Sequence, residues 1–441
     1  MTGYVLPDGT AVVVSDPNAD RVTTVKPADI AAPATPYRSR LATFVVQHSF
    51  LRGVAAVDGA IMINCDTYSA DWATYDPRIG FLCADGTVNM YRTEVDGRAA
   101  WMYRAAEHEG KMYGCVSAYA LSGGYLGGAC CYDRDGNVEW TSTYRWTGGG
   151  LDASRAAAGS TALYVGTGIT STVTGLMKFS LDGVLLWSKQ YISPSWSWAD
   201  PAAVTPDGGV LCSNSAEKIA RLDSAGDVLW CKDFAHSPNL TYYYVDTVAI
   251  EGERIYAICD NYSDTEYAGI ILAMSLTGEL LWQKALDGYL SMSLIGEETG
   301  IIAVLTRPNA SIPQAEIWVM RYSINGAFEW ARRITLSTPL TYLHAHPLVS
   351  PSEGAMYINT YGTDADGISL DDILCLPTNG SGQGSYGGWV YENCDEPAAD
   401  TGLWTVSDAA WLAEDPSPYT LVAQPYSLTL TPIAQHLGED A

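Results

Sequence analysis

The sequence has few basic residues for its length. Its 441 residues include 24 Lys and Arg against 50 Asp and Glu, a formal net charge of −26 at pH 7. A surface of that sign repels the phosphates of nucleic acids, so we expect no nucleic-acid partner. Some of the acids have a local role, because Asp in turns such as "DRDG" and "SLDG" forms hydrogen bonds with the nearby backbone.

Signatures of membrane insertion, export and catalysis are also missing. No stretch approaches the roughly 18 apolar residues of a membrane span. The start "MTGYVLPDGTAVVVSDPNAD" has no basic stretch followed by an apolar core, so we expect no secretory signal. There is no GxSxG, no phosphate-binding glycine loop and no HExxH. We therefore predict neither catalytic residues nor a cofactor.

The ten cysteines form no CxxC pair. Several of them fall inside predicted strands, which is typical of buried thiols in a reducing compartment: Cys83, Cys212, Cys231 and Cys259. The adjacent Cys130 and Cys131 allow two interpretations. They form an unusual disulfide, or they are two strand residues that face opposite ways, and the second is the more common arrangement.

A strand–turn–strand pattern recurs six times. The copies are "FLCADGTVNMY" (81–91), "CCYDRDGNVEW" (130–140), "MKFSLDGVLLW" (177–187), "ARLDSAGDVLW" (220–230), "LAMSLTGELLW" (272–282) and "MRYSINGAFEW" (320–330). Their turn glycines are Gly86, Gly136, Gly183, Gly226, Gly278 and Gly326. Four residues later stand Met90, Trp140, Trp187, Trp230, Trp282 and Trp330. A degenerate seventh copy, 372–391, ends near Trp389.

Repeats of about 45 residues built from strands predict an all-β fold, a seven-bladed β-propeller, with eight blades as the alternative. One such sheet cannot bury both faces alone, so the sheets stack around an axis. For the fourth copy we predict "PAAVTP" as the inner strand, then "VLCSNS" and "KIARLD", and "DVLWCKDF" as the outer strand. We expect the repeated tryptophans to be buried between neighbouring blades.

The predicted organisation has three parts. Residues 1–40 form an extended N-terminal arm with a possible hairpin in "YVLPDGTAVVV", and 41–394 form the propeller. Within it, 41–50 is the strand that closes the ring, since closure removes open sheet edges. Residues 395–441 have strand character without the repeat pattern, so they form a C-terminal β extension or an atypical eighth blade.

The repeat resembles the tryptophan-docking motif of pyrroloquinoline quinone-type propellers, Ala-x-Asp-x-x-x-Gly-x-x-x-Trp. "AMSLTGELLW" and "RLDSAGDVLW" are close to it, and "CCYDRDGNVEW" is looser. The resemblance implies the packing of the fold. An enzyme of that family would also need a catalytic Asp, calcium-binding Glu and Asn, and export to the periplasm, and we cannot place that set here. Cys130-Cys131 is similar to the vicinal disulfide of those enzymes but lies in a repeat strand.

Two weak metal patterns are present. His344 and His346 lie on one predicted strand face, but no third ligand with suitable spacing accompanies them. The stretch "DADGISLDD" (364–372) offers Asp364, Asp366, Asp371 and Asp372, yet it lacks the spacing and terminal Glu of an EF-hand loop. Rim histidines and metal-free loop acids are the favoured interpretations, so we predict no metal site.

Aromatic residues gather after the outer strands. If these connections emerge on one face of a propeller, they form an aromatic platform suited to a glycan or a protein, because rings give a large contact area at low entropic cost. The alternative is that they cap the blade cores. The platform residues would be Tyr144, Trp146, Trp196, Trp198, Tyr242, Tyr243 and Tyr244.

These features predict a non-enzymatic structural or interaction platform. The end "YSLTLTPIAQ" resembles the endings of bacteriophage tail and fibre proteins, which implies a virion component in a tail, baseplate or fibre. In that role residues 1–40 and 395–441 contact other virion or assembly proteins, and a propeller face binds a host glycan or receptor. The alternative is a quinoprotein-like dehydrogenase or a periplasmic scaffold, with a periplasmic or extracellular location.

Overall fold

The computed structural model defines strands from Tyr4 to Pro432. The described residues, to which all statements below refer, are 4–5, 11–12, 21–24, 38–45, 49–57, 60–68, 75–82, 88–95, 98–119, 125–133, 136–146, 151–168, 173–192, 200–213, 218–235, 242–262, 267–286, 290–297, 299–307, 316–336, 340–350, 355–364, 369–377, 384–386, 389–394, 399–400, 405–408, 421–424 and 428–432.

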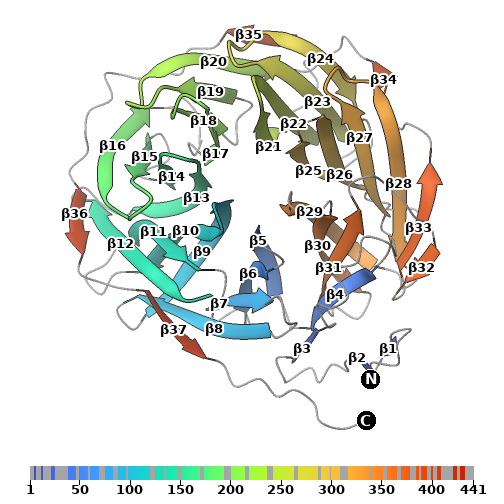
Figure 1. Ribbon diagram of the computed structural model, residues 1–441, viewed down its shortest axis with the longest axis horizontal. Coiled ribbons are helices and arrows are strands. Elements are labelled where there is room, and N and C mark those ends of the chain that lie inside the picture. The colour runs from blue at the N-terminus through green and yellow to red at the C-terminus, as the bar shows by residue number, and fades with distance from the viewer. Residues whose placement is uncertain are drawn as a thin grey trace.

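The chain is an all-β propeller: antiparallel four-stranded sheets, here called blades and numbered along the chain, stand in a ring (Figure 1). The described strands divide into seven such groups of four, and pairing between β8 and β9 joins the first two groups into one sheet. Blade 1 is β5 (Ser49–Val57), β6 (Ala60–Tyr68), β7 (Tyr75–Leu82) and β8 (Val88–Val95); blade 2 is β9 (Arg98–His108), β10 (Lys111–Tyr119), β11 (Tyr125–Tyr132) and β12 (Val138–Trp146); blade 3 is β13 (Asp152–Ala158), β14 (Leu163–Gly168), β15 (Val173–Phe179) and β16 (Leu185–Ile192); blade 4 is β17 (Asp200–Val204), β18 (Val210–Ser213), β19 (Lys218–Leu222) and β20 (Val228–Ala235). Blade 5 is β21 (Tyr242–Glu251), β22 (Arg254–Tyr262), β23 (Tyr267–Ser275) and β24 (Leu280–Ala285); blade 6 is β25 (Leu290–Glu297), β26 (Gly300–Arg307), β27 (Glu316–Ser323) and β28 (Phe328–Leu336); blade 7 is β29 (Leu340–Ser350), β30 (Ala355–Asp364), β31 (Ser369–Pro377) and β4 (Arg38–Val45). The strands predicted for the fourth copy are confirmed as β17–β20.

Blade 7 joins the two ends of the repeat region. Its outer strand β4 precedes blade 1 in the chain and pairs with β31, with Phe44 opposite Asp371. β3 (Arg21–Thr24) then pairs with β4, and further upstream β1 (Tyr4–Val5) and β2 (Ala11–Val12) form the small hairpin. The range 41–50 spans the end of β4 and the beginning of β5.

The predicted seventh copy ending at Trp389 is wrong. Trp389 begins β33 (Trp389–Cys394), which pairs with β28 of blade 6, while β4 occupies the place of a fourth strand beside β31. Within the Gly/Ser-rich stretch before Trp389, the described residues 384–386 belong to the sheet of blade 6. They form strand β32 (Gly384–Tyr386), which pairs with β33.

From β33 onward the chain runs backward around the outside of the ring, as the red and orange strands of Figure 1 show. We call β33–β37 the C-terminal belt. Each belt strand adds a fifth strand to the outer edge of a blade, which covers an edge that would otherwise be open. β33 pairs with β28, β34 (Ala399–Asp400) with β24, β35 (Thr405–Asp408) with β20, β36 (Leu421–Gln424) with β12 and β37 (Leu428–Pro432) with β8.

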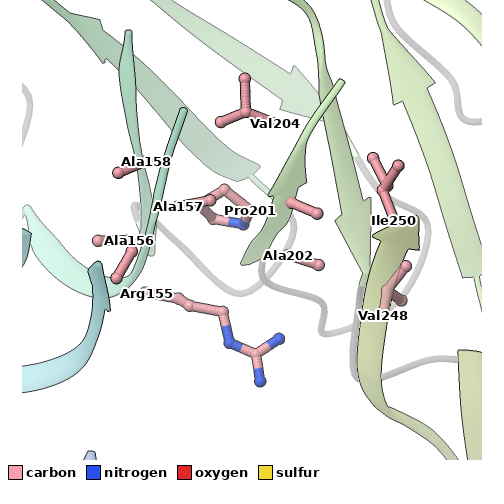
Figure 2. Close-up of a pocket in the computed structure, with 11 residues that line it drawn as sticks. Arg155, Ala156, Ala157, Ala158, Pro201, Ala202, Val204, Val248 and Ile250 are labelled. Atoms are coloured by element: carbon pink, nitrogen blue, oxygen red, sulfur yellow. The ribbon is translucent and has the colours of Figure 1, made fainter. Parts of the chain in front are cut away.

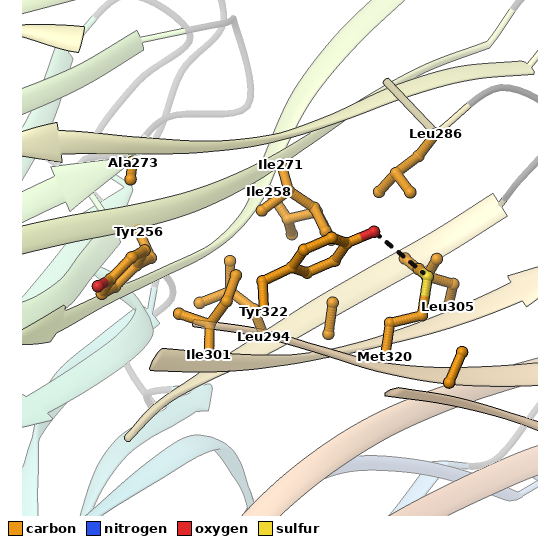
Figure 3. Close-up of a cluster of buried hydrophobic side chains, with 12 residues drawn as sticks. Tyr256, Ile258, Ile271, Ala273, Leu286, Leu294, Ile301, Leu305, Met320 and Tyr322 are labelled. Carbon is orange, nitrogen blue, oxygen red and sulfur yellow. Dashed lines mark hydrogen bonds between the residues drawn. The ribbon is translucent and has the colours of Figure 1, made fainter. Parts of the chain in front are cut away.

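The core lies between neighbouring blades. Figure 3 shows one cluster, in which Tyr256 and Ile271 of blade 5 pack with Ile301 and Tyr322 of blade 6. The Tyr322 hydroxyl donates a hydrogen bond to the Met320 sulfur at 3.8 Å. Burial of such side chains gives each interface its stability, about 1.5–3 kcal/mol for each large side chain.

The repeated turns have one hydrogen-bond pattern. In blade 4, Gly226 has φ of 86°, its N–H donates to the Asp223 carbonyl at 3.0 Å, and the Asp227 N–H donates to Asp223 Oδ1 at 2.9 Å. Ser275 and Ser323 accept the equivalent bond through Oγ in blades 5 and 6. An Asp or Ser three residues before a left-handed glycine is therefore what the turn requires.

The turns of blades 3 to 6 dock on the tryptophan of the preceding blade, whereas the turn glycine of blade 2, Gly136, lies against Phe81. The indole N–H groups donate to backbone carbonyls of the next blade at 2.9–3.1 Å, in the pairs Trp140–Leu181, Trp187–Ser224, Trp230–Leu276 and Trp282–Ile324. The rings lie against the turn glycines, so that a Cβ on Gly326 would be 2.8 Å from Trp282 Cδ2. The positions are equivalent but only half-buried, which corrects the expectation of buried tryptophans. The indole lies at the rim, and the fully buried rings are those of Phe81, Tyr132, Tyr164, Phe179, Tyr191, Tyr256 and Tyr322.

Candidate functional site

The predicted aromatic residues come from different parts of the fold. Tyr144 and Trp146 belong to β12 and pack on the core between blades 2 and 3, where the Tyr144 and Phe179 ring centroids are 5.9 Å apart. This contact matches the core-capping interpretation for these two residues. Tyr242, Tyr243 and Tyr244 open the inner strand β21 instead of lying in a connection. Trp196 and Trp198 lie outside the described residues, and the platform stays a prediction.

A hollow of about 370 Å³ lies among the inner strands of blades 2 to 5. Figure 2 shows β13 and β17 on two sides of it, with Val248 and Ile250 of β21 beyond β17. The lining is mostly alanine and other aliphatic groups: Ala106, Arg155, Ala156, Ala157, Ala158, Pro201, Ala202, Ala203, Val204, Val248 and Ile250. The space exists because β13 and β17 carry methyl side chains at positions where a larger residue would fill it.

Arg155 is the ionisable side chain of this lining, and Figure 2 shows it extending at one end of the hollow. Its Nη1 donates to Ser213 Oγ at 3.4 Å, and the residue is 9% exposed. A guanidinium keeps its charge at every physiological pH and offers five N–H donors. The hollow therefore combines aliphatic walls with one fixed positive group.

Two serine–aspartate hydrogen bonds join blades beside the hollow. Ser117 Oγ of β10 donates to Asp152 Oδ1 of β13 at 2.6 Å, and Ser154 Oγ of β13 donates to Asp200 Oδ1 of β17 at 2.6 Å. Burial raises the pKa of the Asp152 carboxyl, while the hydrogen bond from Ser117 lowers it. The first bond joins the second strand of blade 2 to the inner strand of blade 3, and the second joins the inner strands of blades 3 and 4.

Every inner strand contains one irregularity in its pairing. We call the surface that the inner strands present at the hollow the channel wall. The pairing of each inner strand with its neighbour shifts by one residue, in β13 between Ala153 and Arg155 and in β17 between Pro201 and Ala203. Equivalent shifts occur in β5, β9, β21, β25 and β29. A β-bulge turns side chains away from the regular alternation, and in β13 the shifted residue Ser154 lies beside Arg155.

The remaining residues singled out in the sequence are the Cys130-Cys131 pair and the two metal patterns. Cys130 and Cys131 form no disulfide: they are buried thiols that pack in different core clusters, so they face opposite sides of β11 as favoured, and burial raises the pKa of each to about 12. His344 and His346 lie on β29, but their side chains are outside the described set, as is most of the 364–372 loop. Within the described ranges no three His, Cys, Asp or Glu side chains form a group suited to a metal ion.

The sequence reasoning missed the hollow. Its signal was present as "AAA" at 156–158 and "PAA" at 201–203, small residues in predicted inner strands. Alanine is common in many settings, and only the ring arrangement shows that these segments face one space.

Comparisons with known proteins give this chain no identity. No known family and no curated protein matches the chain. Among solved structures, BamB from Moraxella catarrhalis is similar at 14% identity and a TM-score of 0.41, covering 75% of this chain and 99% of its own. The WD40 domain of SCAP from fission yeast matches at 7% identity and a TM-score of 0.41 (82% and 98% covered), and a GH43_1 enzyme from Xanthomonas citri at 13% and 0.32 (80% and 92% covered). At these scores the likenesses carry no argument about function. Among the described residues no helix is long and apolar enough to cross a membrane.

Proposed function

We propose that this chain is a non-enzymatic structural and interaction platform that receives part of another macromolecule at its channel wall. The observation that carries the proposal is the alanine-lined hollow between the inner strands of blades 2 to 5. Its aliphatic walls suit an apolar side chain, and Arg155 at one end suits a carbonyl or carboxylate oxygen of the same partner.

The lining supports binding better than reaction. A guanidinium cannot accept a proton near neutral pH, and methyl groups neither donate nor accept one. Filling the hollow with an apolar group would remove its walls from water, at about 25 cal/mol for each Å² of apolar surface.

The finer form of the proposal is a bacteriophage virion component, in a tail, baseplate or fibre. The resemblance of residues 426–435 to phage tail and fibre endings supports it, together with an acidic surface that is unsuited to nucleic acid. Mass spectrometry of purified particles from the source tests it: the chain is expected at a fixed copy number, and its absence from intact particles would overturn the virion assignment.

A second test separates the platform from the quinoprotein alternative. The purified chain with pyrroloquinoline quinone and calcium is expected neither to bind the quinone nor to reduce an electron acceptor. Quinone-dependent reduction would replace the proposal with the enzymatic one.

The hollow itself is tested by filling it. Ala203→Leu adds three carbons to its wall, and Ala327→Leu makes the same change at an exposed turn of blade 6. In sedimentation assays with the native assembly, Ala203→Leu is expected to weaken retention at least tenfold and Ala327→Leu to leave it unchanged. A folded Ala203→Leu protein with full retention would remove the hollow as the binding site.

A further inference from the structure

The exposed large apolar side chains of the described residues all lie on three consecutive repeat turns. They are Val184, Leu186, Leu229, Leu280 and Leu281, and they are 39–61% exposed. Val184 and Leu186 belong to the turn and outer strand of blade 3, Leu229 to blade 4, and the last two to blade 5. We call these five residues the apolar arc. Scattered apolar residues on a surface are ordinary, but their concentration on adjoining elements is typical of an interaction surface.

The docking pattern places the three turns next to one another. The blade 4 turn contacts the blade 3 tryptophan, since a Cβ on Gly226 would be 2.8 Å from Trp187 Cη2. The blade 5 turn contacts the blade 4 tryptophan in the same way, through the Trp230 bond to the Leu276 carbonyl. The half-buried Trp187 and Trp230 therefore lie between the three turns and extend the apolar surface.

The flanking blades use acids at the same repeat position. Leu186, Leu229 and Leu281 stand three residues after their turn glycines, where blade 2 has Glu139 and blade 6 has Glu329. Glu139 pairs with Lys111 at 2.6 Å, and Glu329 pairs with Arg321 at 2.8 Å. The position thus accepts a carboxylate within this fold, and leucine there is not required by the turn.

The belt leaves these leucines accessible. β35 pairs with residues 232–235 of β20, and β34 pairs with 284–285 of β24, so both contact the half of the outer strand away from the turn. Leu229 and Leu281 precede those paired segments and remain half-exposed.

Acidic residues border the arc. Asp182 and Glu279 are exposed beside its members, and Asp227 is 63% exposed while it pairs with Lys189 at 2.7 Å. Lys189 and Lys232 lie against the turn glycines of blades 4 and 5, so these three acids face two lysines. Together with the net charge of −26, this border repels anionic lipid and a second copy of the same acidic surface, and it attracts a cationic segment.

We propose that the apolar arc is a docking surface for a partner protein segment in which apolar and basic residues alternate. The apolar side chains of the partner contact the leucines and the indoles, and its lysines or arginines lie beside Asp182, Asp227 and Glu279. The inference rests on the proposed role as an interaction platform, but it concerns the outer turns and not the channel wall.

The test uses a dye-labelled twelve-residue peptide of alternating leucine and lysine, and peptides in which serine replaces leucine or glutamate replaces lysine. Fluorescence anisotropy is expected to show binding of the Leu/Lys peptide at least tenfold tighter than the Ser/Lys peptide, and none of the Leu/Glu peptide. Equal binding of the Leu/Lys and Ser/Lys peptides would overturn the proposal, because charge alone would then explain it.

Matched variants separate the contribution of the apolar arc to peptide binding from the effect of added negative charge. Leu186→Glu with Leu229→Glu introduces the residue type of the flanking blades and is expected to weaken Leu/Lys binding at least tenfold. Asn137→Glu with Ala327→Glu adds the same charge at exposed turns outside the arc and is expected to change it less than twofold. Equal effects of the two variants would overturn the proposal, and Leu186→Ser with Leu229→Ser repeats the test if the first variant does not fold.

Three further outcomes distinguish the two proposed surfaces. Concentration-dependent dimers that the arc variant abolishes would assign the arc to a second copy and overturn the basic partner. Loss of assembly retention in Ala203→Leu with intact peptide binding supports both surfaces. Intact peptide binding with no effect of Ala203→Leu overturns only the channel-wall site.

Discussion

Substituting two glycines by alanine isolates the energy of tryptophan docking. Gly326 and Gly252 both have positive φ, 79° and 59°. A Cβ on Gly326 would meet Trp282 Cδ2 at 2.8 Å, whereas a Cβ on Gly252 would meet nothing within 4 Å. Gly252→Ala therefore measures the cost of a left-handed alanine, about 1–2 kcal/mol. Gly326→Ala adds the displacement of an indole from its turn.

That displacement is expected to cost about 1–3 kcal/mol more, the range for an extra methyl group in a packed site. The Trp282 bond to the Ile324 carbonyl, 3.1 Å long, adds to the loss if the ring moves. Gly326→Ala should thus lower the free energy of unfolding by roughly 2–5 kcal/mol, against roughly 1–2 for Gly252→Ala. Equilibrium urea unfolding followed by far-ultraviolet circular dichroism measures both values.

A double-mutant cycle completes the test. In a Trp282→Ala background the ring is gone, and Gly326→Ala should then cost no more than Gly252→Ala. The coupling between positions 282 and 326 is expected to be about 1–3 kcal/mol. If the two alanine variants are equally stable in the presence of Trp282, the glycine serves only the turn and the docking argument fails.

Four other perturbations have defined outcomes. Because burial raises the folded-state pKa of Asp152, its contribution to stability falls as pH rises from the unfolded pKa, about 3.9, through the folded value. Melting curves should therefore show that Asp152→Asn gains stability relative to the parent protein across that pH window and keeps the gain at pH 7. A stability difference that is the same at all pH values would contradict the raised pKa. Deleting 389–441 removes the belt and exposes the outer edges of blades 1, 2, 4, 5 and 6. Scanning fluorimetry should then show a lower melting temperature and light scattering should show aggregation, and an unchanged protein would refute a structural role for the belt. Deleting residues 1–37 should leave the ring folded because β4 remains, whereas deleting 1–45 should lower the melting temperature sharply; equal stability would mean that the ring closes without β4. Trp196→Ala with Trp198→Ala should weaken binding to the assembly by about 2 kcal/mol or more with the fold intact if the aromatic loops contain hot spots, and a folded variant with full attachment would remove them.

Local sequence was sufficient to predict the blades wherever one strand follows another. The turn glycines, the residue three before each and the tryptophan four after each act within one hairpin and its neighbour, so the strands of the fourth copy were predictable to within two residues at each end. Burial of the tryptophans was overestimated, because their position at the rim depends on the radius of the ring, which no local pattern contains.

The belt and the hollow depend on contacts between distant segments. Nothing in "TVSD" or "LVAQ" indicates a pairing with β20 or β12, since a strand added at an edge needs only backbone groups and little particular side-chain chemistry. The end at Trp389 was misassigned for the same reason: its tryptophan resembles the repeat, but its strand pairs with blade 6. Likewise, the alanines of β13 and β17 become a site only when blades 2 to 5 surround one hollow.

Photo-crosslinking tests the platform directly. Benzoylphenylalanine is placed at Ala203 in the channel wall and, as a control, at Glu253, which is exposed in the turn between β21 and β22, and the native assembly is irradiated. The platform predicts a defined covalent adduct between Ala203 and another macromolecule of the assembly, and no such adduct at Glu253. The same adducts at both positions, or none at Ala203 in a folded, incorporated protein, would contradict it.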